Sequence, residues 1–168
     1  MKKILLMTVL ITFVLSLNAQ SAIDLLFEKY QGSKGFTTIT VSGNMLKLIA
    51  SLDEDENEDD IIKYADKFST IRILVQDDDT VIDENFYDMV IDEVEKSGYE
   101  EMVTINSSDE DVKIMVKAEG KVFKEFLLIS GGDDNAIIQI KGDMTFDDVK
   151  EMSESVKDDH GFNIIGIR

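Results

Sequence analysis

Four β-prone segments follow one another in the second half of the chain, and only short turns separate them. Their apolar residues alternate with polar ones, which is the period of a strand that buries one face. Turns this short join antiparallel neighbours, because a parallel pair needs a crossover of a dozen or more residues. The sequence therefore predicts an antiparallel meander of Glu101–Ile105, Val112–Ala118, Val122–Ile129 and Ala136–Lys141.

Segments on both sides of the meander have helical spacing. Ser21 is a typical helix N-cap, and Gly32 ends the helix that it begins. Thr145 and Asp148 form a weak capping box at the start of the last helix. Further helices are predicted over Met45–Leu52, Ile61–Phe68, Glu84–Ser97 and Thr145–Val156, and further strands over Phe36–Val41, Ile71–Gln76 and, as an edge, Phe162–Ile167.

Strands that succeed one another without intervening helices, with helices before and after them, favour an α+β fold. We expect a mainly antiparallel sheet of five or six strands with helices packed on one face. Phe126–Ile129 is apolar on both alternating sets, so its strand is expected at the centre of the sheet. Residues 20–168 suffice for one such domain, in which the acidic residues 53–60 form a loop between two helices.

The first 19 residues have the pattern of a secretory signal peptide. Lys2 and Lys3 precede an uncharged apolar run, Ile4–Leu17, which is too short to span a bilayer, and Ala19 is the expected cleavage point. The chain has no cysteine, which excludes a lipoprotein anchor and disulfides. We expect an exported protein, periplasmic or secreted, that is not inserted in the membrane after cleavage.

Cleavage leaves 15 basic and 35 acidic residues. Such a chain is repelled by nucleic acid and by anionic membranes, so neither is an expected partner. Its composition favours solubility, divalent cations or basic partners. Most of these acids are expected to form a solvated surface.

The acidic run from Asp53 suggests calcium as an alternative ligand. Asp53, Asp55 and Asn57 match the first ligand positions of an EF-hand loop, but Glu58 replaces the glycine of its turn and Tyr64 its last carboxylate. A solvated interhelical loop is the favoured interpretation. Weak calcium binding through Asp53, Asp55, Asn57 and Asp59 is the alternative.

The sequence offers little for catalysis. His160 is the only histidine, it stands in an acidic turn, and there is no thiol and no nucleophile-elbow pattern. We therefore expect no enzymatic activity. A carboxylate-based hydrolase is the less favoured possibility, and it would need a cleft that holds two acids with shifted pKa values.

Basic residues gather on one alternating set of the predicted strands. Arg72, Lys113 and Lys117 share this set, which we expect on the sheet face opposite the helices, and Lys124 and Lys141 can join them. Such a face would dock an anionic partner, or pair with acids of this chain or of a second copy. An ordinary solvated sheet face is the alternative interpretation.

At Phe126–Ser130, Ile137–Lys141, Gly142, Asp143 and the helix from Thr145, the chain resembles small exported bacterial proteins grouped as domain of unknown function 4252. The similarity runs from about Ser21 to Val156. It implies an exported α+β domain without assigned activity, whose gene often lies beside alternative sigma-factor systems of the envelope. We therefore expect a module that binds another envelope or exported protein, in sensing or signalling, with a homo-oligomer also possible.

Overall fold

The computed structural model of the chain describes residues 21–52, 64–77, 79–108 and 110–148. The predicted signal peptide (1–19), the acidic run (53–60), His160 and the predicted tail strand lie outside these residues. The predicted last helix is described only up to residue 148.

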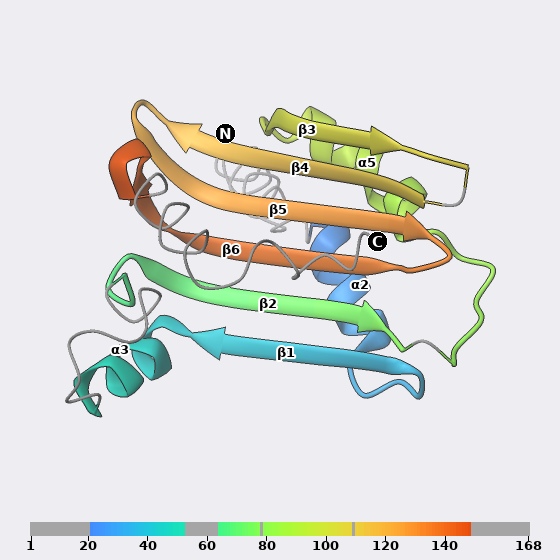
Figure 1. The fold of residues 1–168 in the computed structure, drawn as a ribbon, viewed down its shortest axis with the longest axis horizontal. Helices are drawn as coiled ribbons and strands as arrows, with labels where there is room; N and C mark the ends of the chain where they lie inside the picture. Colours follow the sequence, from blue (N-terminus) through green and yellow to red (C-terminus); the bar gives the residue numbers. More distant parts are fainter. Residues whose placement is uncertain (1–20, 53–63, 78, 109, 149–168) are drawn as a thin grey trace, which may run out of the picture.

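The described residues form a six-stranded antiparallel sheet in the order β1-β2-β6-β5-β4-β3. The predicted meander is confirmed, because β3, β4, β5 and β6 pair successively, and β2 then pairs with β6 and β1 with β2 (Figure 1). β1 and β3 are the two edges. The strands are β1 (Phe36–Ser42), β2 (Phe68–Gln76), β3 (Glu100–Asn106), β4 (Glu110–Glu119), β5 (Val122–Gly132) and β6 (Ala136–Thr145).

Two helices cover one face of the sheet, which we call the helix face, and the opposite side is the open face. They are α2 (Ala22–Tyr30) and α5 (Phe86–Lys96), and both lie behind the sheet in Figure 1. The predicted cap is confirmed, since the Ser21 hydroxyl accepts a hydrogen bond from the Asp24 N–H at 3.1 Å. A third helix, α3 (Gly43–Leu52), follows β1 at one end of the sheet. The α+β prediction, with helices on one face, is confirmed.

The predicted helix over Ile61–Phe68 is wrong at its described end. Residues 64–67 form a turn, and Phe68 begins β2 opposite Gly142 of β6. The backbone approaches closely here, because a Cβ at Gly142 would strike the Lys67 carbonyl and one at Gly43 would strike that of Phe68. β2 therefore begins at Phe68, before its predicted start at Ile71. Its pairing with β6 is irregular between Phe68 and Thr70.

The main core lies between the helix face and the two helices. α2 and α5 pack their apolar stripes against one alternating set of the strands, and this set includes Leu74, Met115 and Leu127. A smaller core, formed by Tyr64, Phe68 and Met144 with Leu46 of α3, lies at the end where β6 finishes. None of the helices described is long and apolar enough to cross a membrane.

Candidate functional site

The predicted position of the basic residues is wrong for Arg72, Lys113 and Lys117. The Arg72 guanidinium lies 4.2 Å from the ring centroid of Phe27 on α2, and the Lys113 ammonium lies 5.9 Å from that of Tyr87 on α5. The Lys117 ammonium lies 5.4 Å from the Tyr99 ring. These residues therefore belong to the helix face.

The physical reason lies in the neighbours two positions along each strand. Leu74 has the orientation of Arg72 and is fully buried in the main core, and Met115, between Lys113 and Lys117, is 2% exposed. The apolar stems of Arg and Lys pack under a helix while their charged ends find partners at its margin. The apolar residues of the other set, such as Ile71 and Ile73, consequently face away from the helices.

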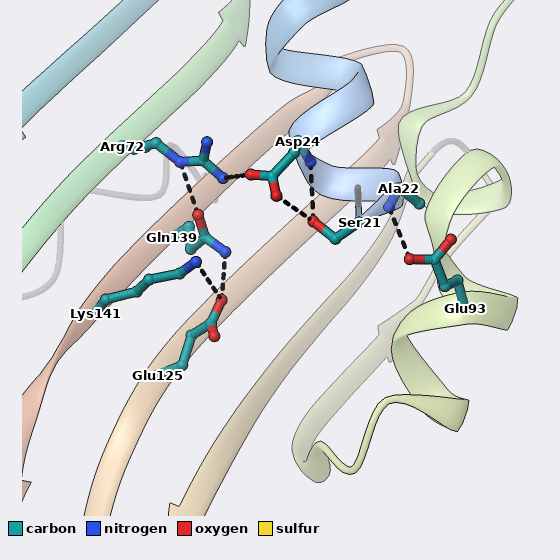
Figure 2. Close-up of polar contacts among 8 residues, drawn as sticks. All are labelled: Ser21, Ala22, Asp24, Arg72, Glu93, Glu125, Gln139 and Lys141. Carbon is teal, nitrogen blue, oxygen red and sulfur yellow. Dashed lines mark hydrogen bonds and ion pairs between the residues drawn. The ribbon is translucent and has the colours of Figure 1, made fainter. Parts of the chain in front are cut away.

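Arg72 is the centre of a polar network on the helix face, which Figure 2 shows. It donates to Asp24 Oδ1 at 2.6 Å and to Gln139 Oε1 at 2.7 Å. Gln139 in turn donates to Glu125, whose carboxylate lies 4.0 Å from the Lys141 ammonium. Gln139 is 2% exposed, so its amide is satisfied by these bonds and not by water.

The network also fixes the start of α2 on the sheet. Burial acts to raise the pKa of Asp24, but hydrogen bonds from Ser21 and Arg72, together with the Arg72 charge, hold it below its usual value. On the other side of the helix the Ala22 N–H donates to Glu93 Oε1 of α5 at 2.8 Å (Figure 2). Arg72 thus joins α2 to the sheet, and Glu93 joins it to α5.

Lys113 and Lys124 are also paired within the chain. The Lys113 ammonium lies 2.7 Å from Glu95 and 3.0 Å from Glu101, and its side chain is 7% exposed. Hydrogen bonding to Glu95 raises the pKa of Lys113 against the opposing effect of burial. Lys124 lies apart, 2.6 Å from Asp143. Of the five predicted residues, Arg72, Lys113, Lys124 and Lys141 thus face acids of this chain, so the structure brings together no free basic patch.

Among the residues that the structure describes, the carboxyl groups with a shifted pKa give no support to acid catalysis. They are Asp24, Glu84, Glu101 and Asp148, and the pKa of each is lowered. A general acid needs the opposite shift. Within the described ranges no group of three or more acids or histidines is placed to hold a metal ion, and the predicted calcium ligands lie outside those ranges.

A cavity of about 480 Å³ lies where α3 meets the ends of β2 and β6. Lys47, Lys67 and Lys124 line it, together with Asp66 and Asp143. Lys124 is held by Asp143, and the Lys67 ammonium lies 3.7 Å from Asp148. Two of its three lysines are therefore already neutralised, and the cavity is no evident anion site.

The outer face of α3 is the feature that the sequence-based reasoning missed. Met45, Leu48, Ile49 and Leu52 stand at positions i, i+3, i+4 and i+7 and are 50%, 52%, 41% and 72% exposed. The opposite side of the helix packs through Leu46 on the smaller core, and Figure 1 shows α3 extending beyond the end of the sheet. The sequence signal that could have indicated this face is a low content of charged residues. Residues 36–52 contain one charged side chain, Lys47, in a chain that is 31% charged.

Comparison with known proteins supplies a family. The family model described as "Domain of unknown function (DUF4252)" matches residues 30–152, which confirms the resemblance noted in the sequence. No curated protein and no solved structure matches the chain.

Proposed function

Because the chain belongs to the DUF4252 family, whose description names no activity, we propose a function from its own geometry. It is an exported domain that binds another protein of the cell envelope. The contact is made by the outer face of α3, formed by Met45, Leu48, Ile49 and Leu52, which enters an apolar groove of that partner.

The pattern of exposed side chains on α3 carries this proposal. Anchors at i, i+3, i+4 and i+7 are those of a helix that lies in a groove. Single exposed apolar residues are ordinary, but four on one helical face form a contiguous patch of the kind that marks interaction sites. Burying their exposed halves contributes about 4 kcal/mol, roughly a thousandfold in affinity.

The charge of the chain indicates what surrounds the groove. The net charge is −18, and seven of the eight residues after Leu52 in the sequence are acids. A groove with a basic rim is therefore the complementary partner, and its association is expected to be faster at low salt. The Lys2–Lys3 pair and the apolar run after it support export, which brings the domain to envelope proteins.

The test is crosslinked affinity capture from envelope extract, with the tagged protein compared with two matched variants. Leu48 on α3 and Leu25 on α2 are both 52% exposed, so Leu48→Glu and Leu25→Glu place the same charge on equally exposed sites. The proposal expects one dominant partner that is retained by the wild type and by Leu25→Glu and lost with Leu48→Glu. Equal retention by all three proteins would contradict it.

One further variant examines the earlier prediction of a basic contact. Lys117 is the exposed member of the five basic residues and lies over Tyr99. If Lys117→Glu loses the partner and Leu48→Glu retains it, the contact lies on the helix face and not on α3. Measuring the affinity of the purified partner for the protein at increasing salt concentration should then show whether the affinity falls with salt.

A further inference from the structure

Strand β1 forms an open edge of the sheet. It stands at one end of the strand order, and among the residues that the structure describes only β2 pairs with it. Figure 1 shows no labelled element alongside its free side, since α3 lies beyond the end of the strand. Thr37, Ile39 and Thr40 are exposed, Ile39 to 44%. β1 is therefore accessible to another strand along its length.

The register identifies the backbone groups of β1 that face outward. In an antiparallel pair, residues that exchange backbone hydrogen bonds alternate with residues whose N–H and C=O groups point away from the partner strand. The Asp77 N–H donates to the Gly35 carbonyl at 2.9 Å, and the pairing continues from there without a shift. The N–H of Gln76 donates on the β6 side instead. The residues of β1 that point their N–H and C=O groups out of the sheet are therefore Phe36, Thr38 and Thr40.

β1 also lacks the features that protect an edge from pairing. Proteins protect exposed edges with charged side chains, proline or bulges. β3, at the other edge, has two glutamates and a register shift between Glu101 and Val103. β1 has no charged residue, no proline and no register shift, and after Phe36 it consists of threonine, isoleucine, valine and serine. Such an edge is suited to β-strand addition, in which an extended peptide pairs with the edge strand.

We propose that β1 binds an extended segment of another protein, which adds an antiparallel strand to the sheet and carries a basic residue at its C-terminal end. The contact uses a different surface from the outer face of α3, and it does not depend on the proposed function.

The side chains of β1 define the pattern of this segment. On the open face it would lie beside Ile39 and Val41, so apolar side chains suit every second position. On the helix face it would lie beside Thr38 and Thr40, where threonine or serine makes a favourable cross-strand pair. The expected segment therefore alternates apolar and hydroxyl-bearing residues.

Asp77 determines which end of the segment is basic. Its carboxylate accepts a hydrogen bond from the Thr37 hydroxyl at 3.0 Å, and the residue is exposed. Thr37 lies near the start of β1, so an antiparallel segment brings its C-terminal end to this position. A lysine or arginine there lies within reach of Asp77. The net charge of −18 also attracts a basic segment at long range.

A second copy of this chain is the other strand donor to consider. Pairing two β1 strands would bring together two chains of net charge −18, and their repulsion opposes this contact. A basic segment has the opposite charge, so the charge of the chain favours a different protein.

The first test measures binding of a synthetic peptide by fluorescence anisotropy at low salt. The probe alternates threonine with valine or isoleucine and ends in lysine, and alternate amides are N-methylated so that only one edge can pair. This peptide is expected to bind the protein saturably, and the same peptide methylated at every amide is expected not to bind. No saturable binding of the first peptide, or equal binding of both, would overturn the proposal.

Variants of the protein locate the contact. Ile39 on β1 and Ile105 on β3 are 44% and 42% exposed at the two edges, so lysine at either place adds the same charge to a similar site. Ile39→Lys is expected to weaken peptide binding at least tenfold, and Ile105→Lys to leave it unchanged. Thr40→Pro, which removes an outward N–H, should also weaken it. Equal affinities in folded variants, verified by urea denaturation, would contradict the proposal.

Two outcomes separate this contact from the others considered. Leu48→Glu on α3 should leave peptide binding unchanged, so failure of the proposed function does not affect this test. Sedimentation of the wild type without peptide tests the second copy. A dimer that Ile39→Lys abolishes and Ile105→Lys retains would assign the edge to a second copy and overturn the proposal.

Amide hydrogen exchange followed by NMR tests the contact residue by residue. In the free protein the N–H groups of Thr38 and Thr40 should exchange faster than those of Ile39 and Val41, which the register directs to β2. Saturating peptide should slow exchange at Thr38 and Thr40 at least tenfold. Unchanged exchange at these two residues would contradict strand addition at β1.

Discussion

The side-chain oxygen of Asn135 accepts a 2.7 Å hydrogen bond from the backbone N–H of Phe86, the first residue of α5, and both residues are fully buried. The same amide donates to Gln76 Oε1 at 2.7 Å and to the Glu84 carbonyl at 3.1 Å. One side chain therefore ties the end of β2 and the start of α5 to the β5–β6 turn.

Replacing Asn135 should destabilise the protein strongly. Asn135→Ala leaves the buried Phe86 N–H without this partner, which costs about 1–3 kcal/mol, and it also removes the bonds to the Glu84 carbonyl and to Gln76. We expect a loss of about 2–4 kcal/mol in the free energy of unfolding, measured by urea denaturation. Asn106→Ala at an exposed position is the control, and a loss no larger than its own would refute this role.

The Arg72 network should be worth more than an exposed charge. Arg72→Ala removes the bonds to Asp24 and Gln139 and the packing on Phe27. We expect it to cost about 2 kcal/mol by urea denaturation. Lys121→Ala, in the exposed β4–β5 turn, should change stability by less than about 0.5 kcal/mol. Similar losses in the two variants would show that the network is not stabilising.

Tyr99 should make the protein sensitive to alkaline pH. Burial raises the pKa of its phenol, and hydrogen bonding to Glu125 adds to this shift. Since the unfolded phenol ionises near pH 10, the stability that Tyr99 contributes is complete below about pH 10 and declines above it. The melting temperature should fall more steeply between about pH 10 and 11.5 in the wild type than in Tyr99→Phe. Parallel curves would be the contrary result.

Gly131 should not tolerate a side chain. A Cβ there would strike Asn85 Oδ1, the cap of α5, and would lie 2.7 Å from the Tyr87 backbone nitrogen. We expect Gly131→Ala to lower stability by about 2–4 kcal/mol. The same change at Gly120 meets nothing within 4 Å and carries only the strain of its φ of +64°, about 1 kcal/mol. Thermal melts of both variants test this ranking, and a loss at Gly120 as large as that at Gly131 would contradict it.

The elements of the fold were predictable because their patterns are local. The meander follows from alternation and short turns, and the caps at Ser21 and Thr145 follow from residue type and spacing. Which side chains of β2 lie on the helix face was not predictable in this way. The set with Ile71 and Ile73 has more apolar residues than the set with Leu74, yet Leu74 packs against the helices. Arg72 lies on the same side as Leu74 and therefore also faces the helices. A strand that is apolar on both sides gives no local sign of which side a helix will cover.

The candidate site was harder to predict for a related reason. Arg72 and Lys113 drew attention as charges, but their partners Asp24, Glu95 and Glu101 come from elements distant in the sequence or across a turn. The sequence predicts a helix over Met45–Leu52 but not which of its apolar residues are exposed, because helical spacing does not tell whether a second layer exists to cover them. Only the tertiary structure shows that Leu46 is partly buried against the smaller core while Leu48 is exposed.

Strand β1 has a consequence for how the protein behaves in concentrated solution. Its seven residues carry no charge, no proline and no bulge in their pairing with β2, whereas the other edge, β3, has Glu100, Glu101 and an irregular register. In the sheet that the described residues form, β1 is an edge, and an uncharged edge of this kind is a template for ordered self-association. What holds copies apart is the net charge of −18 carried elsewhere on the chain, a repulsion that reaches ~8 Å at physiological ionic strength and ~3 Å in molar salt. The acidic side chains of the chain therefore oppose fibre formation by their mutual repulsion, and concentrated salt, whose counterions screen that repulsion, is the condition expected to weaken this protection.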